Sequence, residues 1–386
     1  MVLPDYILFL TQLKEASYIK TKVRIIMNKL NVAILYGGTS LEKDVSVITG
    51  LQVIQNINKQ KYKIYPIYID TNGIWWHTPK IKKIEDLHNV KKQKVYIKTG
   101  ENYFYFNLIT NNKIKIHCAI NCLHGGYGEN GAISSMLEMC KIPSNSSNIT
   151  SCNSTLNKYL TKIILEKNNF NVLPYILLNK DALDNNKLTS FININSFPIV
   201  VKPIDMGSSI GVTFAENMED LEKGLKLVFS YCNYALIEKG IKKVTEYNCS
   251  AMQAREKLIV SEVEKPIKKS SILTYAEKYG SKGFNKLGCK TACKGFSSLG
   301  REFPAKISKN LTDKIKNLTY NAYTLFNCSG IVRCDYIYYN KKLYLNEINS
   351  IPGSLSFYLW SNSGYSFETL IDNLITTSIL KFNQKQ

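Results

Sequence analysis

Several features are scarce or missing in this sequence of 386 residues, and each absence excludes something. No apolar run reaches the roughly 20 residues that a membrane-spanning helix needs, and no secretory signal is evident. Acidic residues are few, at 30 against 50 Lys and Arg, so the formal net charge is +20. That charge comes without a long block of like charge or an Arg-rich stripe, which argues against a nucleic-acid-binding surface. We expect a cytoplasmic protein with solvated surface lysines and neither a nucleic-acid nor a membrane partner. The alternative is a nucleic-acid-binding module, whose affinity would fall steeply with salt.

Cysteine pairs with the usual zinc-binding spacing are also missing, although the chain has ten cysteines. His117, Cys118, Cys122 and His124 gather in IKIHCAINCLHGG, but at spacings that differ from those of common zinc sites. The segment is apolar and strand-like, where a free cysteine behaves as a small hydrophobic residue. We therefore expect buried thiols in a reducing compartment and no structural zinc.

Strand-like and helix-like segments alternate along most of the chain. Residues 1–26 differ from the rest, and we predict them to be an N-terminal extension before a natural start at Met27. Strands are then predicted at 31–36, 63–69 and 114–123, with an amphipathic helix from about Leu41. Further strands are predicted at 197–203 and 234–241, and further helices at 154–168, 311–325 and 367–375. This alternation indicates an α/β fold with parallel strands.

Residues 331–349, IVRCDYIYYNKKLYLNEIN, have the pattern of a β-hairpin around a polar Asn-Lys-Lys loop. A loop centred on Lys341 places Asp335 opposite Glu347 and Arg333 opposite Asn349, all on one face. The opposite face is then expected to hold Cys334, Tyr336, Asn346 and Ile348. Opposed carboxylates repel each other, so a cation or a proton must lie between them. Their hard oxygen atoms suit Mg²⁺, and Arg333 would face a reacting phosphate or oxyanion. The alternative is an ion-pair ladder on a solvated hairpin.

Three glycine-containing segments could surround a ligand. In LYGGTSLEKDVS, Glu42 is either a carboxylate at the mouth of a site or part of a helix-capping box with Thr39. HGGYGENG precedes an amphipathic helix whose N-terminus would favour an anion. In VVKPIDMGSSIGV a buried strand leads into Lys202 and a Ser/Gly loop that could fold over phosphates, although an ordinary turn would look similar.

In order along the chain, GGTSLEKDVS, HGGYGENG, VKPIDMGSSIGV, LIEK and RCDY…NEINSIPG resemble the D-alanine–D-alanine ligase family of the ATP-grasp superfamily. The resemblance extends from about Met27 to the last helix. It implies a three-domain ATP-grasp architecture, with an N-terminal Rossmann-like parallel sheet and two α+β domains that clasp ATP. The implied domains are a substrate-binding domain at 27–149, a central ATP-grasp domain at 150–240, and a C-terminal ATP-grasp domain with lid loop and metal site at 241–386.

The resemblance also assigns roles to residues at matching positions. ATP would contact Lys158 and Lys202 with its phosphates, Glu238, Lys239 and Ile241 with its adenine, Glu246 with its ribose, and also Ser209 and Lys278. Two Mg²⁺ ions, or Mn²⁺ in their place, would bind Asp335, Glu347 and Asn349. The amino-acid substrates would contact Glu42, His124, Tyr358 and Leu359, and catalysis would use Glu42, Ser208, Tyr279, Arg333 and the amide of Gly353.

The implied reaction makes D-alanyl-D-alanine for peptidoglycan in two steps, through an acyl phosphate of the first D-alanine that the amine of the second attacks. The family further implies a homodimer. Tyr279 favours an amine acceptor, because relatives that make an ester carry His there. Tyr358 departs from the Ser that many members use for the second substrate, so an acceptor such as D-serine stays an alternative. Asn130, Ser134, Ser135 and Asn157 also depart from the family pattern, which leaves a catalytically weak nucleotide-binding paralogue as a further alternative.

Overall fold

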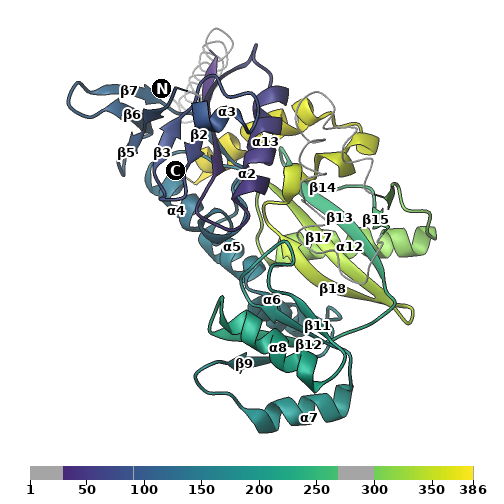
Figure 1. Ribbon diagram of the computed structural model, residues 1–386. Coiled ribbons are helices and arrows are strands. Elements are labelled where there is room, and N and C mark those ends of the chain that lie inside the picture. Colours follow the sequence, from purple (N-terminus) through teal and green to yellow (C-terminus); the bar gives the residue numbers. More distant parts are fainter. Residues whose placement is uncertain (1–28, 90, 268–299, 386) are drawn as a thin grey trace, which may run out of the picture.

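The computed structural model describes residues 29–89, 91–267 and 300–385, which form three main sheets (Figure 1). The first sheet is mixed: β1 runs parallel to β2 and β8, whereas β3 and β4 join antiparallel at one edge. In spatial order its strands are β4 (Gln93–Lys94), β3 (Trp75–His77), β2 (Tyr62–Ile69), β1 (Leu30–Gly37) and β8 (Cys118–Asn121). The predicted Rossmann-like parallel sheet is thus confirmed for the central strands.

Helices cover one face of this sheet, and a helix and a small sheet cover the other. On the first face, α2 (Lys43–Asn56) and the C-terminal helix α13 (Phe367–Gln384) share one apolar core with β1 and β8. The opposite face packs against α4 (Ala132–Met139) and the three-stranded sheet of β5 (Tyr96–Ile97), β6 (Tyr103–Asn107) and β7 (Asn112–Lys115). The short helices α3 (Asp86–Asn89) and η1 (Gly126–Gly128) lie in connections. The single strand predicted at 114–123 is wrong, because β7 and β8 belong to different sheets.

The second sheet is antiparallel, so the parallel strands expected from the alternation are confined to the first sheet, and the antiparallel order agrees with an α+β domain. Its order is β11 (Thr213–Ala215), β10 (Ile199–Pro203), β12 (Tyr234–Lys239) and β9 (Tyr175–Asn179). Side chains of α7 (Asn185–Asn195) and α8 (Met218–Phe229) complete its core. Lys202 and Glu238 lie on the adjacent strands β10 and β12 of this sheet.

The third sheet is also antiparallel and contains the predicted hairpin. Its order is β14 (Lys257–Val260), β13 (Thr245–Ala254), β17 (Ile331–Tyr339) and β18 (Lys342–Asn349), and α12 (Lys309–Leu325) packs against it. A separate pair, β15 (Lys265–Pro266) and β16 (Arg301–Glu302), lies beside β13. After β18 the chain forms the short helices η3 (Gly353–Leu359) and η4 (Ser361–Ser363) before α13. The predicted domain limits at 150 and 241 stay predictions, and each falls between two of the sheets.

The helix predicted at 154–168 is in fact two helices, α5 (Ile149–Leu156) and α6 (Lys158–Lys167). Asn157 separates them, because its extended backbone ends α5 while its side chain accepts hydrogen bonds from the amides of Tyr159 and Leu160. The break places Lys158 in the first turn of α6, where its side chain reaches the space between the second and third sheets.

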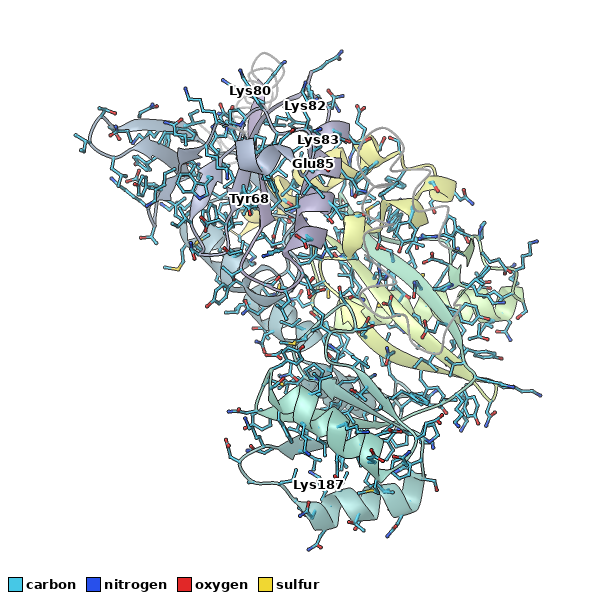
Figure 2. All side chains as sticks on the ribbon, in the orientation of Figure 1. Tyr68, Lys80, Lys82, Lys83, Glu85 and Lys187 are labelled. Atoms are coloured by element: carbon cyan, nitrogen blue, oxygen red, sulfur yellow. The ribbon has the colours of Figure 1, made fainter. Side chains whose placement is uncertain are left out.

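The lysines are distributed over distant parts of the surface. Lys80, Lys82 and Lys83 are exposed near α3, and the exposed Lys187 on α7 lies at the opposite end of the molecule (Figure 2). None of the helices in the described part of the chain combines the length and apolar composition needed to span a membrane.

Candidate active site

One pocket joins segments from all three sheets. It is lined by Glu129 from the loop after β8, Lys158 of α6, Gly207 from the loop after β10, and Glu347 and Asn349 of β18, among others. Lys158 was predicted as a site residue, and so were Glu347 and Asn349, which lie far from it in the sequence. The structure therefore brings a cation and two oxygen ligands of the predicted set to one cavity.

Glu42 lies beside this pocket and is 6% exposed. Ser208, which has a positive φ of 52°, donates a hydrogen bond to its carboxylate. Space here is limited: a Cβ at Gly207 would lie 2.8 Å from Glu42 Oε2, and one at Gly125 would lie 2.5 Å from it. Both loops need glycine at these positions, because each passes directly over the carboxylate. Burial raises the pKa of Glu42, and the nearby Glu129 raises it further.

The capping-box interpretation of Glu42 is wrong. Glu42 itself occupies the N-cap position of α2, and its side chain makes no capping hydrogen bond. Its backbone amide donates to Ser40 Oγ at 3.1 Å, while its carboxylate turns toward Ser208. The alternative interpretation, a carboxylate at the mouth of a site, agrees with this geometry.

His124 is buried at 4% exposure and links two parts of the site. Its Nδ1 lies 3.4 Å from Glu129 Oε1, and its Nε2 lies 2.9 Å from Thr49 Oγ1 on α2. Thr49 Oγ1 also accepts a hydrogen bond of 3.1 Å from the backbone amide of Ser354 in η3. A continuous chain of polar contacts thus runs from the pocket to the turn that follows Gly353.

Two lysines converge on the buried carboxylate of Glu238, which is 1% exposed. Lys202 and Lys162 each contact one of its oxygens, and Lys202 Nζ also donates to Asn346 Oδ1 at 3.2 Å. Burial opposes ionisation, but Lys162 and Lys202 outweigh it and lower the pKa of Glu238. Lys158 donates instead to the carbonyl oxygen of Met206. Burial lowers the pKa of Lys162 although Glu238 opposes this, and with two lysines for one carboxylate the cluster has an excess of basic groups next to the pocket.

The hairpin has the predicted residue pairs, but a β-bulge produces them instead of a loop centred on Lys341. Asp335 pairs with Glu347 and Arg333 with Asn349, but the loop has only two residues, Asn340 and Lys341, both with positive φ. Nearer the loop the register is one residue different, and a β-bulge between Asp335 and Tyr336 restores the predicted pairs. The prediction for Asn346 is wrong: it contacts Lys202 rather than sharing the buried face of Cys334, Tyr336 and Ile348.

Arg333 supplies a positive charge beside Asp335 on the same strand. Its Nε and Nη2 donate to the two oxygens of Asp335 at 2.6 and 2.7 Å, and Asn349 Nδ2 donates to Asp335 Oδ2 at 3.1 Å. Burial raises the pKa of Asp335 to about 6 despite Arg333, and Glu347 opposite adds to the rise. No group of three His, Cys, Asp or Glu side chains among the described residues is placed to hold a metal. The predicted set has two carboxylates, so its third donor would be the amide oxygen of Asn349, a hard-oxygen set that suits Mg²⁺.

The segment after β18 carries the remaining substrate-site predictions. Gly353 begins η3, and Ser354, Leu355 and Ser356 follow with φ values of 53°, 51° and 48°. Leu359 is 0% exposed in the core, so any contact of this residue with a substrate would be through its backbone. Tyr358 packs its ring against the guanidinium of Arg301, with 4.4 Å between Arg301 Cζ and the ring centroid.

The other predicted residues fall at the edge of this region. Ser209 has a positive φ of 61° in the loop after β10, and the Lys239 side chain donates to Ser196 O at 3.1 Å. Ile241 lies in the connection between the second and third sheets, and Glu246 is on β13 opposite Ile337. Lys278 and Tyr279 lie outside the described residues.

Sequence reasoning missed several residues that the structure brings to the site. Lys162 follows Lys158 by one helical turn, a spacing that could have indicated a shared face. Glu129 is part of the HGGYGENG segment, but it was not predicted as a site residue. No sequence motif marks Thr49, Glu264 or Arg301. Thr49 contacts His124 and Ser354, and Glu264 contacts Arg301, all of which are distant in the sequence.

A pocket that Lys158 of α6 lines together with Glu347 and Asn349 of one antiparallel sheet, next to Lys202 of a second, agrees with the ATP-grasp class of protein. Family models support and refine this class: "D-ala D-ala ligase N-terminus" matches residues 31–147, and "D-ala D-ala ligase C-terminus" matches 164–376. The chain belongs to the D-alanine–D-alanine ligase family.

Individual relatives agree over nearly the whole length. A D-alanine–D-alanine ligase of Thermosipho africanus is 34% identical, over 92% of this chain and 95% of the relative. The crystal structure of the Helicobacter pylori D-alanine–D-alanine ligase is 26% identical, with a TM-score of 0.72 over 90% of this chain and 98% of that one. The Bacillus anthracis D-alanine–D-alanine ligase, solved in complex with ATP, is 24% identical, with a TM-score of 0.67 over 93% of this chain and 100% of that one. At 24% identity, this last similarity concerns the fold alone.

Proposed function

We propose that the protein is an ATP-dependent ligase that joins two D-alanines into D-alanyl-D-alanine for peptidoglycan synthesis, releasing ADP and phosphate. The observation that carries the proposal is the shared pocket. Lys158, Glu129 and the hairpin residues Glu347 and Asn349 line it, and Gly207 in its wall packs against Glu42. A lysine, hard oxygen atoms and a buried carboxylate therefore lie in one place, which supports roles in binding a phosphate, a metal ion and a substrate ammonium group.

In the first step, the carboxylate of the first D-alanine attacks the γ-phosphate of ATP, which gives an acyl phosphate and ADP. Glu42, oriented by Ser208, would pair with the ammonium group of this D-alanine, and His124 would lie beside it. The excess of basic groups in the cluster of Lys162, Lys202 and Glu238, together with Lys158, would offset the charge of the phosphates. Lys239, Ile241, Glu246 and Ser209 would hold the rest of the nucleotide.

In the second step, the amine of the second D-alanine attacks the acyl carbonyl carbon, and phosphate leaves. Arg333 and the amide of Gly353 would stabilise the oxyanion that forms. Asp335, Glu347 and Asn349 fit two Mg²⁺ ions, or Mn²⁺, which when bound would neutralise phosphate charge during transfer. Tyr358 and the backbone at Leu359 would contact the second amino acid. To reach the oxyanion, Arg333 would have to give up part of its contact with Asp335.

We further infer that the enzyme works in the cytoplasm as a homodimer and uses only small-molecule substrates. Each cysteine among the described residues has a free thiol, which supports a reducing compartment. The dispersed lysines at both ends of the molecule support a surface without a nucleic-acid-binding stripe (Figure 2).

The test is phosphate release from ATP and Mg²⁺ with D-alanine alone, and then with a panel of D- and L-amino acids, with products identified by mass. We expect release with D-alanine alone and formation of the dipeptide. Release only with a mixture would favour a different acceptor. ATP binding without release would favour a catalytically weak paralogue.

The second candidate is a ligase of D-alanine with another amino acid, such as D-serine. It is motivated by Tyr358, which stands where many members of the family have Ser and whose ring packs against Arg301. The same panel separates the two candidates, because the second amino acid appears directly in the mass of the product.

A further inference from the structure

The Tyr358 ring packs against a buried ion pair. Arg301 lies with its guanidinium 4.4 Å from the centre of the Tyr358 ring, a distance at which a cation interacts favourably with an aromatic face. Arg301 Nη1 lies 2.9 Å from Glu264 Oε1, and the two side chains are 15% and 4% exposed. Glu264 Oε2 accepts a hydrogen bond of 3.0 Å from Asn248 Nδ2. The guanidinium therefore contacts both the Tyr358 ring and a carboxylate that is itself held by Asn248.

This ion pair adjoins the acidic hairpin. Asn248 on β13 pairs directly with Asp335 on β17, which in turn pairs with Glu347 on β18. The charges of Arg333 and Asp335 act on the Tyr358 hydroxyl together with those of Arg301 and Glu264. Tyr358 thus packs against the Arg301–Glu264 ion pair and also feels the charges of the Arg333–Asp335 pair on the hairpin.

The ion pair also joins two segments that are distant along the chain. Glu264 precedes β15, Arg301 begins β16, and these short strands pair through Lys265 with Glu302 and Pro266 with Arg301. An arginine is suited to this position because its flat guanidinium can cover a ring and bind a carboxylate at the same time. A lysine would keep the charge but not the flat surface.

We propose that Arg301, held by Glu264, is a positioning residue that fixes the Tyr358 ring and thereby determines which second amino acid the enzyme accepts. This inference rests on the proposed function, in which Tyr358 contacts the second substrate. Arg301 acts through the ring and does not contact the reacting atoms. Loss of Arg301 allows the ring to move, which changes the space and the polarity offered to the second amino acid.

The experiment measures product selection rather than rate. Wild type and variants receive ATP, Mg²⁺ and an equimolar mixture of D-alanine and D-serine, and mass spectrometry gives the ratio of D-alanyl-D-alanine to D-alanyl-D-serine. A loss of active protein does not move this ratio. We expect Arg301→Met to change it by roughly three- to tenfold, Glu264→Gln to change it in the same direction, and Arg301→Lys to change it less.

The matched control is Lys316→Met. Lys316 forms a 2.7 Å ion pair with Glu262, two residues from Glu264, and these side chains are 28% and 33% exposed. This variant should leave the product ratio unchanged. If Arg301→Met does not fold, Glu264→Gln and Arg301→Lys carry the test. An unchanged ratio in every active Arg301 and Glu264 variant would overturn the inference and leave the proposed function standing. A wild type that makes no dipeptide from any amino acid would overturn both.

Discussion

Glu238 shows how single residues set the charge beside the pocket. Its carboxylate is shared by Lys162 and Lys202, and both Glu238 and Lys162 are almost fully buried. Breaking a buried ion pair by removing one partner is costly, because it leaves an incompletely compensated charge. The sequence indicated Lys202 and Glu238 but not Lys162, since its role depends on the break at Asn157 that sets the direction of α6.

Lys162→Met should therefore lower the free energy of unfolding by about 3 kcal/mol and raise the KM for ATP, since Lys202 would be bound more tightly by Glu238. Urea unfolding and phosphate-release kinetics measure the two effects. The exposed Lys226→Met on α8 is the control. A Lys162→Met protein as stable as wild type would contradict the buried pairing.

Glu347→Gln should abolish turnover, by roughly 100-fold or more, because it removes a charged oxygen ligand from the pocket. The structural change is small, so the protein should still fold and bind ATP. Phosphate release and ATP titration separate these outcomes. Glu256→Gln, on an exposed turn between β13 and β14, serves as the control. Near-normal turnover of Glu347→Gln would refute the assignment of the hairpin.

At the scale of elements, sequence patterns located most strands and helices but not the irregularities that place the site residues. The hairpin was predicted from its alternating apolar and polar residues. Its bulge could not be predicted, because the extra residue leaves that alternation intact. The bulge nevertheless turns the Asn346 side chain toward Lys202. The helix at 154–168 and the strand at 114–123 were each predicted as one element, because a single asparagine or histidine interrupts an otherwise continuous apolar periodicity. Tertiary contacts decide such breaks.

The turn in η3 depends on a contact from another element. Three consecutive residues from Ser354 have left-handed φ values, which cost on the order of 1 kcal/mol each. The hydrogen bond from the Ser354 amide to Thr49 Oγ1 holds the start of this turn against α2. The same hydroxyl orients His124.

We expect Thr49→Val to lower stability by about 1–2 kcal/mol and also to lower kcat, because both the turn after Gly353 and His124 lose a partner. Thermal unfolding and steady-state kinetics test the pair of effects. Thr319→Val is the matched control: Thr319 is buried and its hydroxyl lies 2.9 Å from that of Tyr336, away from the pocket. It should lower stability alone. Equal kcat in both variants would argue against the link through Thr49.

At the scale of the whole molecule, the last helix completes the first core. Phe367, Leu370, Ile371, Leu374 and Ile375 of α13 were predicted as one apolar face, and all are buried in the cluster that contains β1 and α2. The helix was predicted from its period, but its partner was not, since nothing local specifies which sheet it covers. Figure 1 shows α13 lying next to α2.

Leu374→Ala should therefore destabilise the first sheet, by about 2–5 kcal/mol, and not only the last helix. Hydrogen exchange of amides in β1 and β8 should accelerate with that of α13. Leu380→Ala on the same helix, where Leu380 is 42% exposed, should have little effect on either. Faster exchange confined to α13 would contradict a shared core.

The shared core of β1, α2 and α13 has a consequence for biosynthesis. A ribosome delivers β1 and α2 long before α13, so one apolar face of the first sheet has no cover until residues 367–384 have been made. Domains generally fold in order of synthesis, but this one must wait for α13. Nascent chains stalled before residue 367 should therefore expose that face to chaperones, whereas the second sheet, whose core lies within residues 176–237, can already be complete.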